Sequence, residues 1–165
     1  MSYSIAQINS MSQEEFVAAL GAIFEETPAI AHSTWEKRPF VDVTDLHQQM
    51  INAVKAMSKQ EQLALIQAHP DLGSKVKMAE ASVQEQSGVG LDRLTVEEYA
   101  RFEQLNTAYK AKFDFPFIVA VKNHTKDSIF AAFEQRLENS VDREFESAIA
   151  EIYQIAQFRL LAIVV

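Results

Sequence analysis

Along most of the chain, apolar residues recur at the three- and four-residue spacing of an α-helix. Phe16, Leu20 and Phe24 show this spacing and predict a helix over residues 13–26, and the last helix is expected to run to Leu160. Side chains that can cap a helix stand before several expected helices, and they are Ser12, Asp42 or Thr44, Ser58, Thr95, Thr125 and Ser140. The pattern therefore predicts a chain made mainly of helices.

Three segments lack this regular pattern. Residues 28–42 contain two of the four prolines, which indicates a short helix that leads into an irregular connection. Residues 70–94 are polar and hold three of the four glycines. Residues 115–121 are the only continuous run of β-branched and aromatic side chains; with no second run to pair with, they are expected to form an extended loop or a helix start. No linker or repeat divides the chain, so we expect a single all-α domain over residues 1–165, with roughly seven to nine helices.

Composition narrows the classes of protein to which the chain can belong. Its 165 residues, 48% of them hydrophobic and 23% charged, suit one globular domain. The formal charge of -8 has the wrong sign for binding nucleic acid, so no nucleic-acid partner is expected. The absence of cysteine excludes disulfides, thiolate metal sites and cysteine nucleophiles, and it favours a cytoplasmic location. Because the chain has neither a signal peptide nor a run of about 18 apolar residues, we expect no membrane partner.

Four histidines are the first candidates for chemistry. No two of them stand at the close helical spacing of a metal-binding pair, so no metal site is expected. His47 fits a helix face and His124 a solvent loop, and both are interpreted as structural. His69 ends an apolar helix, because Pro70 disfavours helical geometry in the residue before it. Its ring therefore either interacts with the dipole of that helix or takes part in chemistry at the following loop.

A polar segment and one arginine are harder to explain by packing. Residues 82–86, Ser-Val-Gln-Glu-Gln, either start a short helix with Ser82 and Glu85 as a capping box or offer polar groups to a small ligand. Arg159 lies seven residues after Ile152, so it points inward with the apolar face of the last helix. A buried guanidinium needs an anion, which could be Glu85 or the carboxylate of a substrate. Otherwise Arg159 closes the helix dipole or reaches past the helix end to water.

Taken in order, these segments resemble a known family. A His-Pro-Asp-Leu turn at residues 69–72, a Ser-x-x-Glu-Gln segment at 82–86 and a Lys-Phe-x-Phe-Pro-Phe segment at 112–117 form a specific combination. By this combination the sequence resembles the 2-oxo-4-hydroxy-4-carboxy-5-ureidoimidazoline (OHCU) decarboxylases of urate degradation. The similarity covers nearly the whole chain, and its further matches are Arg38-Pro39-Phe40, Gly90-Leu91, Leu105-Asn106 with Tyr109, Arg136 with Asn139, and Arg159-Leu160.

The resemblance implies an all-helical homodimer without a cofactor, which converts a ureidoimidazoline substrate to (S)-allantoin with loss of carbon dioxide. By position, His69 matches the catalytic histidine and proton donor, with Pro70 beside it, and Glu85 matches its acidic partner. Arg159 matches the arginine near the charged groups of the substrate. Two further segments match the residues that bind the substrate: Ser82, Val83, Gln84, Glu85 and Gln86, and the stretch that binds through its backbone, Phe117, Ile118, Val119, Ala120 and Val121.

Two features depart from the usual pattern of the family. Asp114 stands where the family usually has glycine, so the turn before residues 117–121 is expected to differ slightly. The connection from Gly73 to Ser82 is shorter than in many members, which is expected to change the conformation of that loop. Neither departure alters the motifs on either side.

The chemistry of this reaction agrees with the residues present. Loss of carbon dioxide leaves an electron pair, which the imidazoline C=N and its neighbouring carbonyl can accept, so neither pyridoxal, thiamine nor a metal is required. The protein must hold the substrate and deliver a proton to one face, which suits a histidine with an ordinary pKa of about 6.5. Two other interpretations stay open: a non-catalytic helical interaction module, and a hydrolase of a related ureide in which Glu85 activates water.

Overall fold

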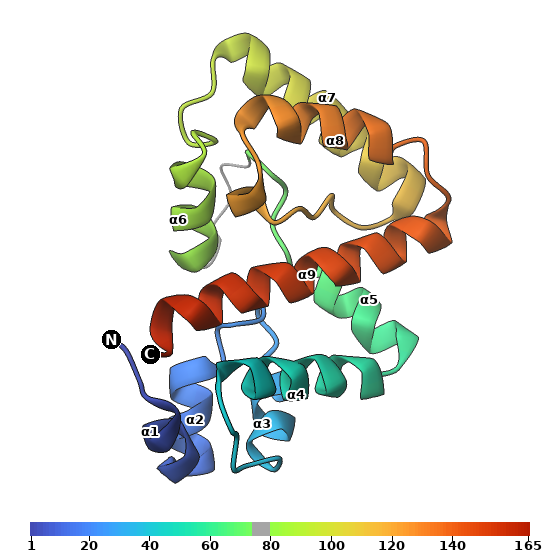
Figure 1. The fold of residues 1–165 in the computed structure, drawn as a ribbon. Helices are drawn as coiled ribbons and strands as arrows, with labels where there is room; N and C mark the ends of the chain where they lie inside the picture. The colour runs from blue at the N-terminus through green and yellow to red at the C-terminus, as the bar shows by residue number, and fades with distance from the viewer. Residues whose placement is uncertain (74–79) are drawn as a thin grey trace. The chain divides into compact units, whose positions relative to one another are not determined.

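Helices make up nearly all the regular structure (Figure 1). The computed structural model describes the backbone of residues 1–73 and 80–165 and the side chains of residues 1–73 and 84–165. Its elements are α1 (Ile5–Ser10), α2 (Gln13–Leu20), α3 (Ala29–Trp35), α4 (Val43–Ala56), α5 (Lys59–Gln67), α6 (Glu80–Gly88), α7 (Val96–Phe113), the 3-10 helix η1 (Val121–Asn123), α8 (Lys126–Arg136) and α9 (Val141–Ile163). Over these ranges the only β-type pairing is an isolated bridge between Tyr3 and Val164. The prediction of an all-α fold is confirmed.

The helix starts follow the predicted capping residues closely. Four predicted caps form capping boxes, and they are Ser12, Ser58, Thr95 and Thr125. In each box the hydroxyl of the cap accepts a hydrogen bond from the backbone N–H of the third helical residue. The side chain of that third residue accepts a hydrogen bond from the backbone N–H of the cap. For α4 the structure decides between the two candidates, because Asp42 and not Thr44 accepts from the N–H of Asp45, at 2.8 Å. At α9, Ser140 accepts from the N–H of Arg143 at 3.2 Å. Local sequence therefore determines where most helices begin.

The helix predicted over residues 13–26 is shorter than expected. α2 ends at Leu20, and Gly21 follows as its C-cap, because glycine is a poor helix former. Ile23 and Phe24 are nevertheless buried, with 5% and 2% of their surface exposed. The apolar pattern thus continues into a turn that packs in the core.

Two further helix boundaries differ from the prediction. α1 is not among the predicted helices, although Ser4 and Gln7 form a capping box at its start. α6 begins at Glu80, so Ser82 lies inside the helix, and its interpretation as the capping residue is wrong. In the described part of the chain, no helix has both the length and the apolar composition needed to cross a membrane.

The chain divides into two compact units, of which the first comprises Met1–Ala68 and Tyr153–Val165. In this unit α2 packs against α3, and α3 packs against α4 (Figure 1). The N–H of Tyr3 donates to Ile163 O at 2.8 Å, and the N–H of Val165 donates to Tyr3 O at 2.9 Å. The two chain ends are therefore joined within one unit.

Arg38 connects three segments of the first unit. Its guanidinium donates to the main-chain oxygens of Asn9, Met11 and Trp35 at 3.0, 2.8 and 2.9 Å, and it lies 4.0 Å from the centre of the Trp35 ring. The Asn9 side chain accepts from the N–H of Phe40 at 2.8 Å and donates to the oxygen of the same residue at 2.9 Å. The Arg-Pro-Phe segment that resembles the family is thus a structural element of this unit.

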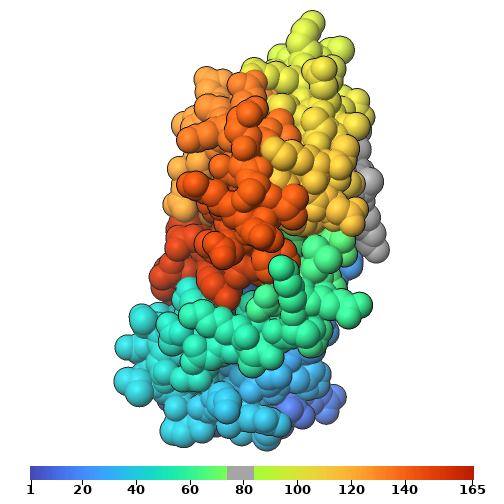
Figure 2. Space-filling view, turned by 90° about the vertical axis from the view of Figure 1, so that its right-hand side faces the viewer, coloured from blue at the N-terminus to red at the C-terminus, as the bar shows by residue number. Residues whose placement is uncertain are grey.

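The second unit, His69–Ile152, has an aromatic core. Tyr109 of α7 is fully buried, and its ring lies 4.4 to 6.0 Å, centre to centre, from those of Phe113, Phe115, Phe117 and Phe133. Phe117 and Phe133 stack at 4.0 Å with an interplanar angle of 11°. In Figure 2 the yellow side chains of α7 and the orange side chains of α8 and early α9 cover this unit. The core therefore holds the first residue of the 117–121 stretch.

Replacing Phe133 by Ala should destabilise the protein by about 3–5 kcal/mol, because it removes a buried ring and leaves a cavity. Val96→Ala, at a position of α7 that is 82% exposed, should change the free energy of unfolding by less than about 0.5 kcal/mol. Urea unfolding followed by circular dichroism measures both. A loss below about 1 kcal/mol for Phe133→Ala would contradict this packing of the core.

Candidate active site

His69 lies between α5 and the loop that opens the second unit. α5 ends at Gln67 with Ala68 as its C-cap, and His69 follows with 8% of its surface exposed. The prediction that this helix stops near His69 is confirmed. Pro70, the next residue, is half-buried. His69 is therefore a buried titratable side chain at a helix-to-loop junction.

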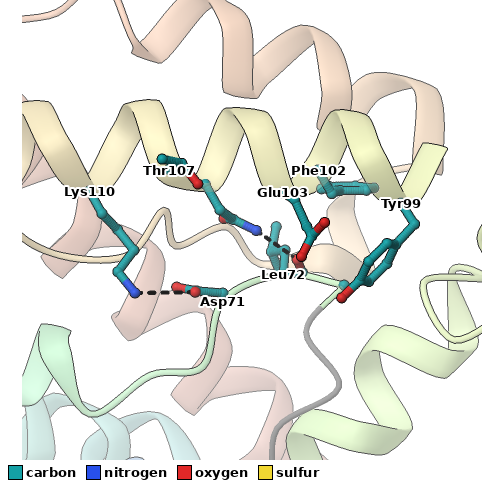
Figure 3. Close-up of a pocket in the computed structure, with 9 residues that line it drawn as sticks. Asp71, Leu72, Tyr99, Phe102, Glu103, Thr107 and Lys110 are labelled. Atoms are coloured by element: carbon teal, nitrogen blue, oxygen red, sulfur yellow. Dashed lines mark hydrogen bonds and ion pairs between the residues drawn. The ribbon is translucent and has the colours of Figure 1, made fainter. Parts of the chain in front are cut away.

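The turn after His69 is held at three consecutive residues. Lys110 of α7 forms an ion pair with Asp71 at 3.2 Å, and Asn106 of the same helix donates to Leu72 O at 3.0 Å (Figure 3). The N–H of Gly73 donates to a side-chain oxygen of α6 at 3.0 Å. Gly73 has a φ of 70°, and an added Cβ would lie 3.0 Å from a methyl carbon of Leu94. The position therefore needs glycine, and the turn is fixed relative to α6 and α7.

A cavity of about 330 Å³ lies between this turn and α7 (Figure 3). Tyr99, Glu103 and Thr107 line it together with the turn. Among the side chains that the structure describes, none of the residues predicted to act on or bind the substrate lines this cavity. It lies on the α7 side of the turn, and its lining includes Asp71 and Leu72 of the His-Pro-Asp-Leu motif and Asn106.

The polar segment at residues 82–86 lies on α6. The side chains of Ser82 and Val83 are outside the described part, and the connection through residues 74–79 lies outside the described residues altogether. Gln84 is exposed, Glu85 is half-buried and Gln86 is buried. The Oε1 atom of Gln86 accepts the hydrogen bond from the N–H of Gly73. One of the residues predicted to bind the substrate therefore also bonds within the fold. α6 also packs against η1, which brings this segment beside the end of the 117–121 stretch.

Residues 117–120 are irregular and lead into η1, which begins at Val121; the sequence predicts an extended loop or a helix start over residues 115–121. Each of the five residues 117–121 has at most 4% of its surface exposed. Asp114, which ends α7, adopts the left-handed conformation with φ 63° and ψ 23°. Glycine favours this region, and aspartate tolerates it better than most residues. Asp114 thus takes a conformation that suits the family's usual glycine, and the turn into the buried stretch is formed.

Two side chains bond to the main chain of this stretch. The Nη1 atom of Arg136, the last residue of α8, donates to Ile118 O at 2.6 Å. The Oε2 atom of Glu151 in α9 accepts from the N–H of Ala120 at 2.9 Å. The residue between them, Val119, therefore has a fixed peptide plane on each side.

Because peptide units are planar, these two hydrogen bonds also determine where the N–H and the C=O of Val119 point. The C=O of Ile118 and the N–H of Val119 belong to one trans peptide unit and point in opposite directions, and the same holds for the C=O of Val119 and the N–H of Ala120. The N–H of Val119 therefore points away from Arg136, and its C=O points away from Glu151. Over residues 1–73 and 80–165 neither group has a hydrogen-bond partner, although Val119 is only 4% exposed. Buried peptide groups are rarely left unpaired, so this pair is suited to a ligand.

A buried carboxylate, Glu144 of α9, holds Arg136 in place. It accepts from Arg136 Nε at 3.0 Å, from Asn139 Nδ2 at 2.8 Å and from the hydroxyl of Tyr109. The Nη2 atom of Arg136 lies 2.9 Å from the same carboxylate, outside good hydrogen-bond geometry. Burial, together with the hydrogen bond to Glu144, raises the pKa of Tyr109 well above its ordinary value, so the hydroxyl remains a donor.

Glu144 and Glu151 are not among the site residues predicted from the sequence. A signal for Glu144 was present, because it precedes the buried residues Ala148 and Ile152 by four and eight positions on α9. A carboxylate on an inward stripe requires a partner, as Arg159 does. A search for acidic residues at helical spacing from buried apolar residues would therefore have identified Glu144.

Arg159 lies in the first unit and points inward, as predicted, with 6% of its surface exposed. Its Nη1 atom lies 3.2 Å from Glu25 Oε2 and donates to Ile23 O at 3.2 Å. Glu25 is 2% exposed and stands in the turn that replaces the end of the predicted helix 13–26. Glu25 is not among the anions predicted as partners of Arg159. α9 continues to Ile163, so Arg159 is not in its last turn, and the interpretation as a cap of the helix dipole is wrong.

The two histidines interpreted as structural bond within the fold. The Nε2 atom of His47 lies 2.9 Å from Tyr153 O, and the Nδ1 atom of His124 lies 2.9 Å from the hydroxyl of Ser128. Among the side chains that the structure describes, no cluster of three histidine, aspartate or glutamate residues could hold a metal ion. Of the four histidines, His69 is the one that is buried.

Comparison with known sequences gives one consistent family. A family model described as OHCU decarboxylase matches residues 9–161 and so extends through both units. The chain is 42% identical over 157 residues to the 2-oxo-4-hydroxy-4-carboxy-5-ureidoimidazoline decarboxylase of Halalkalicoccus jeotgali, covering 95% of this chain and 89% of that protein. It is 43% identical to a uric acid degradation bifunctional protein of Bacillus subtilis, covering 98% of this chain and 33% of that longer protein.

Solved structures agree with this result. A crystal structure of (S)-allantoin synthase superposes with a TM-score of 0.79 at 29% identity, covering 97% of this chain and 54% of that chain. A crystal structure of OHCU decarboxylase in the presence of (S)-allantoin gives a TM-score of 0.69 at 20% identity, covering 92% of this chain and 97% of that chain, and it supports the fold alone. With a family match over residues 9–161 and relatives above 40% identity, the chain belongs to the OHCU decarboxylase family.

Proposed function

We propose that this protein is a decarboxylase of urate degradation that converts OHCU to (S)-allantoin and carbon dioxide. Its family and the names of its relatives support this activity. The observation that carries the proposal is the unpaired backbone pair of Val119, which lies in the stretch that resembles the family's substrate-binding segment. The other proposed roles are built around this pair.

Val119 offers a donor and an acceptor to the substrate. A ureide carries N–H and C=O groups on one edge, so it can accept from the N–H of Val119 and donate to its C=O. Leaving a buried polar group unpaired costs about 1–3 kcal/mol, and the bound ligand would remove that cost. Recognition through main-chain atoms sets the orientation of the planar ring and the ureido group without requiring a charged side chain.

The reaction then needs one proton on one face. The C–C bond to the carboxylate breaks, carbon dioxide leaves, and the electron pair passes to the ring C=N. A proton added to the carbon that carries the ureido group creates the stereocentre of allantoin. In this proposal His69 donates that proton, and Glu85 favours the protonated imidazole and orients its ring. The burial of His69 limits proton delivery from bulk water, which would not select a face.

Arg159 is proposed to orient the substrate through its charged groups, a role implied by the family resemblance. A cation bound tightly to the departing carboxylate would stabilise the ground state more than the transition state. The bonds of its Nη1 atom to Glu25 and Ile23 support a fixed guanidinium that binds and does not react. The remaining expectations, a homodimer, action as one domain over residues 1–165 and a cytoplasmic location, stay predictions that follow from the resemblance and the composition.

The activity is tested with substrate made freshly from urate by urate oxidase and hydroxyisourate hydrolase. With this protein present, circular dichroism should show a rapid rise of one allantoin enantiomer, and carbon dioxide should be released in equal amount. A rate equal to spontaneous decay would contradict the proposal. Addition of water without release of gas would instead identify a hydrolase.

His69→Ala should lower turnover by about 10²–10⁴-fold, the usual contribution of a general acid, while binding of (S)-allantoin is retained. His32→Ala, which changes an exposed histidine, is the matched control and should leave turnover unchanged. Turnover is followed by circular dichroism and binding by calorimetry. Full activity in His69→Ala would remove His69 from the mechanism.

Arg159→Lys should raise KM about tenfold or more and lower kcat less, because lysine keeps the charge but loses the fork of donors that binds a carboxylate. Steady-state kinetics separates the two constants, and thermal unfolding shows whether the pair with Glu25 has been disrupted. A loss confined to kcat would argue against an orienting role.

A further inference from the structure

We propose that Glu151 and Arg136 are positioning residues, which hold the peptide planes on both sides of Val119 so that its N–H and C=O face the substrate. This inference rests on the proposed function and adds two residues to which the family resemblance gives no such role. Neither side chain needs to touch the substrate. They act through Ala120 and Ile118.

The two residues hold the stretch from different elements. Arg136 ends α8 and bonds to the oxygen of Ile118, whereas Glu151 lies on α9 and bonds to the N–H of Ala120. Each bond fixes one peptide plane, and Val119 stands between the two planes. If either bond is lost, the adjoining plane can rotate, and one of the two groups offered by Val119 loses its direction.

Arg136 is rigid, because its partners are themselves buried. Glu144 has no exposed surface; it accepts a hydrogen bond from Arg136 Nε at 3.0 Å and forms an ion pair with Nη2 at 2.9 Å. The guanidinium carbon also lies 4.5 Å from the centre of the Phe117 ring. The remaining nitrogen, Nη1, is the one that reaches Ile118 O. Arg136 therefore contacts the stretch at two places, the backbone oxygen of Ile118 and the side chain of Phe117.

Glu151 is the more informative residue to change. Among the described residues its carboxylate has one partner, the N–H of Ala120. It is half-buried and is not one of the aromatic residues of the core, so its replacement removes no ring from that core. A hydrogen bond from a main-chain N–H needs an acceptor and not a charge, so glutamine can replace the carboxylate with the same reach.

The test compares Glu151→Ala, Glu151→Gln and the control Glu146→Ala, which removes an exposed carboxylate from the same helix. Glu151→Ala should raise KM about tenfold with a smaller change in kcat, equivalent to the loss of one well-placed charged hydrogen bond. Glu151→Gln should stay within about threefold of the unchanged protein, and Glu146→Ala should have no effect. Thermal unfolding of each variant is measured in parallel. If Glu151→Ala does not fold, Glu151→Asp replaces it, because it keeps the charge but shortens the reach to Ala120.

Hydrogen exchange of the backbone gives a second readout that needs no activity. The amides of residues 117–121 should exchange at least tenfold faster in Glu151→Ala than in the unchanged protein, whereas Glu151→Gln should match the unchanged protein. Equal kinetics and equal exchange in Glu151→Ala would overturn the inference. An equal loss of activity in Glu151→Gln and Glu151→Ala would also overturn it, because the charge and not the acceptor would then matter. Absence of decarboxylation in the unchanged protein would contradict only the proposed function, and hydrogen exchange would still decide the positioning role.

Discussion

The peptide bonds on the two sides of Val119 are the constraint on which the proposed site depends. A trans peptide unit sends its C=O and its N–H in opposite directions, so a side chain that binds one of them also directs the other. Arg136 binds the oxygen of Ile118 and Glu151 binds the N–H of Ala120. Val119 is thereby left with a buried donor and a buried acceptor that no described part of the chain uses.

This constraint is supported by a buried charge network. Glu144 accepts from residues of three separate segments, namely Tyr109 in α7, Arg136 at the end of α8 and Asn139 after it. A buried ion pair often adds little net stability, but removing one partner is strongly destabilising, since it leaves an uncompensated charge. We therefore interpret the network as a device that gives Arg136 one geometry. The stacked rings of Phe117 and Phe133 hold the same stretch from its first residue.

Local signals in the sequence predicted much of the fold. The capping boxes that begin at Ser58 and Thr95 each span four consecutive residues. A pattern of that length can be recognised without knowledge of the tertiary structure. α1 has the same kind of signal at Ser4 and could have been found. The end of α2 was placed too late, because buried residues at helical spacing continue into the following turn.

The site could be predicted only in part, because its supporting contacts join residues far apart in the sequence. The motif at His69 and the stretch at residues 117–121 are contiguous, so resemblance to a family located them. The bond from Glu151 to Ala120 and the pair of Arg159 with Glu25 join distant segments, and no spacing rule connects them. What the sequence did contain was a sign that Glu144 and Arg159 lie on the inward face of a helix, where each charge requires a partner.

The most direct test of this account is a titration of the isotope-labelled protein with (S)-allantoin, followed by NMR of the backbone amides. Binding through the main chain of Val119 predicts that its amide proton moves downfield as the new hydrogen bond forms. The amide proton of Ala120, already bonded to Glu151, should move less. Saturable shifts elsewhere in the spectrum with the Val119 amide unchanged would contradict the account.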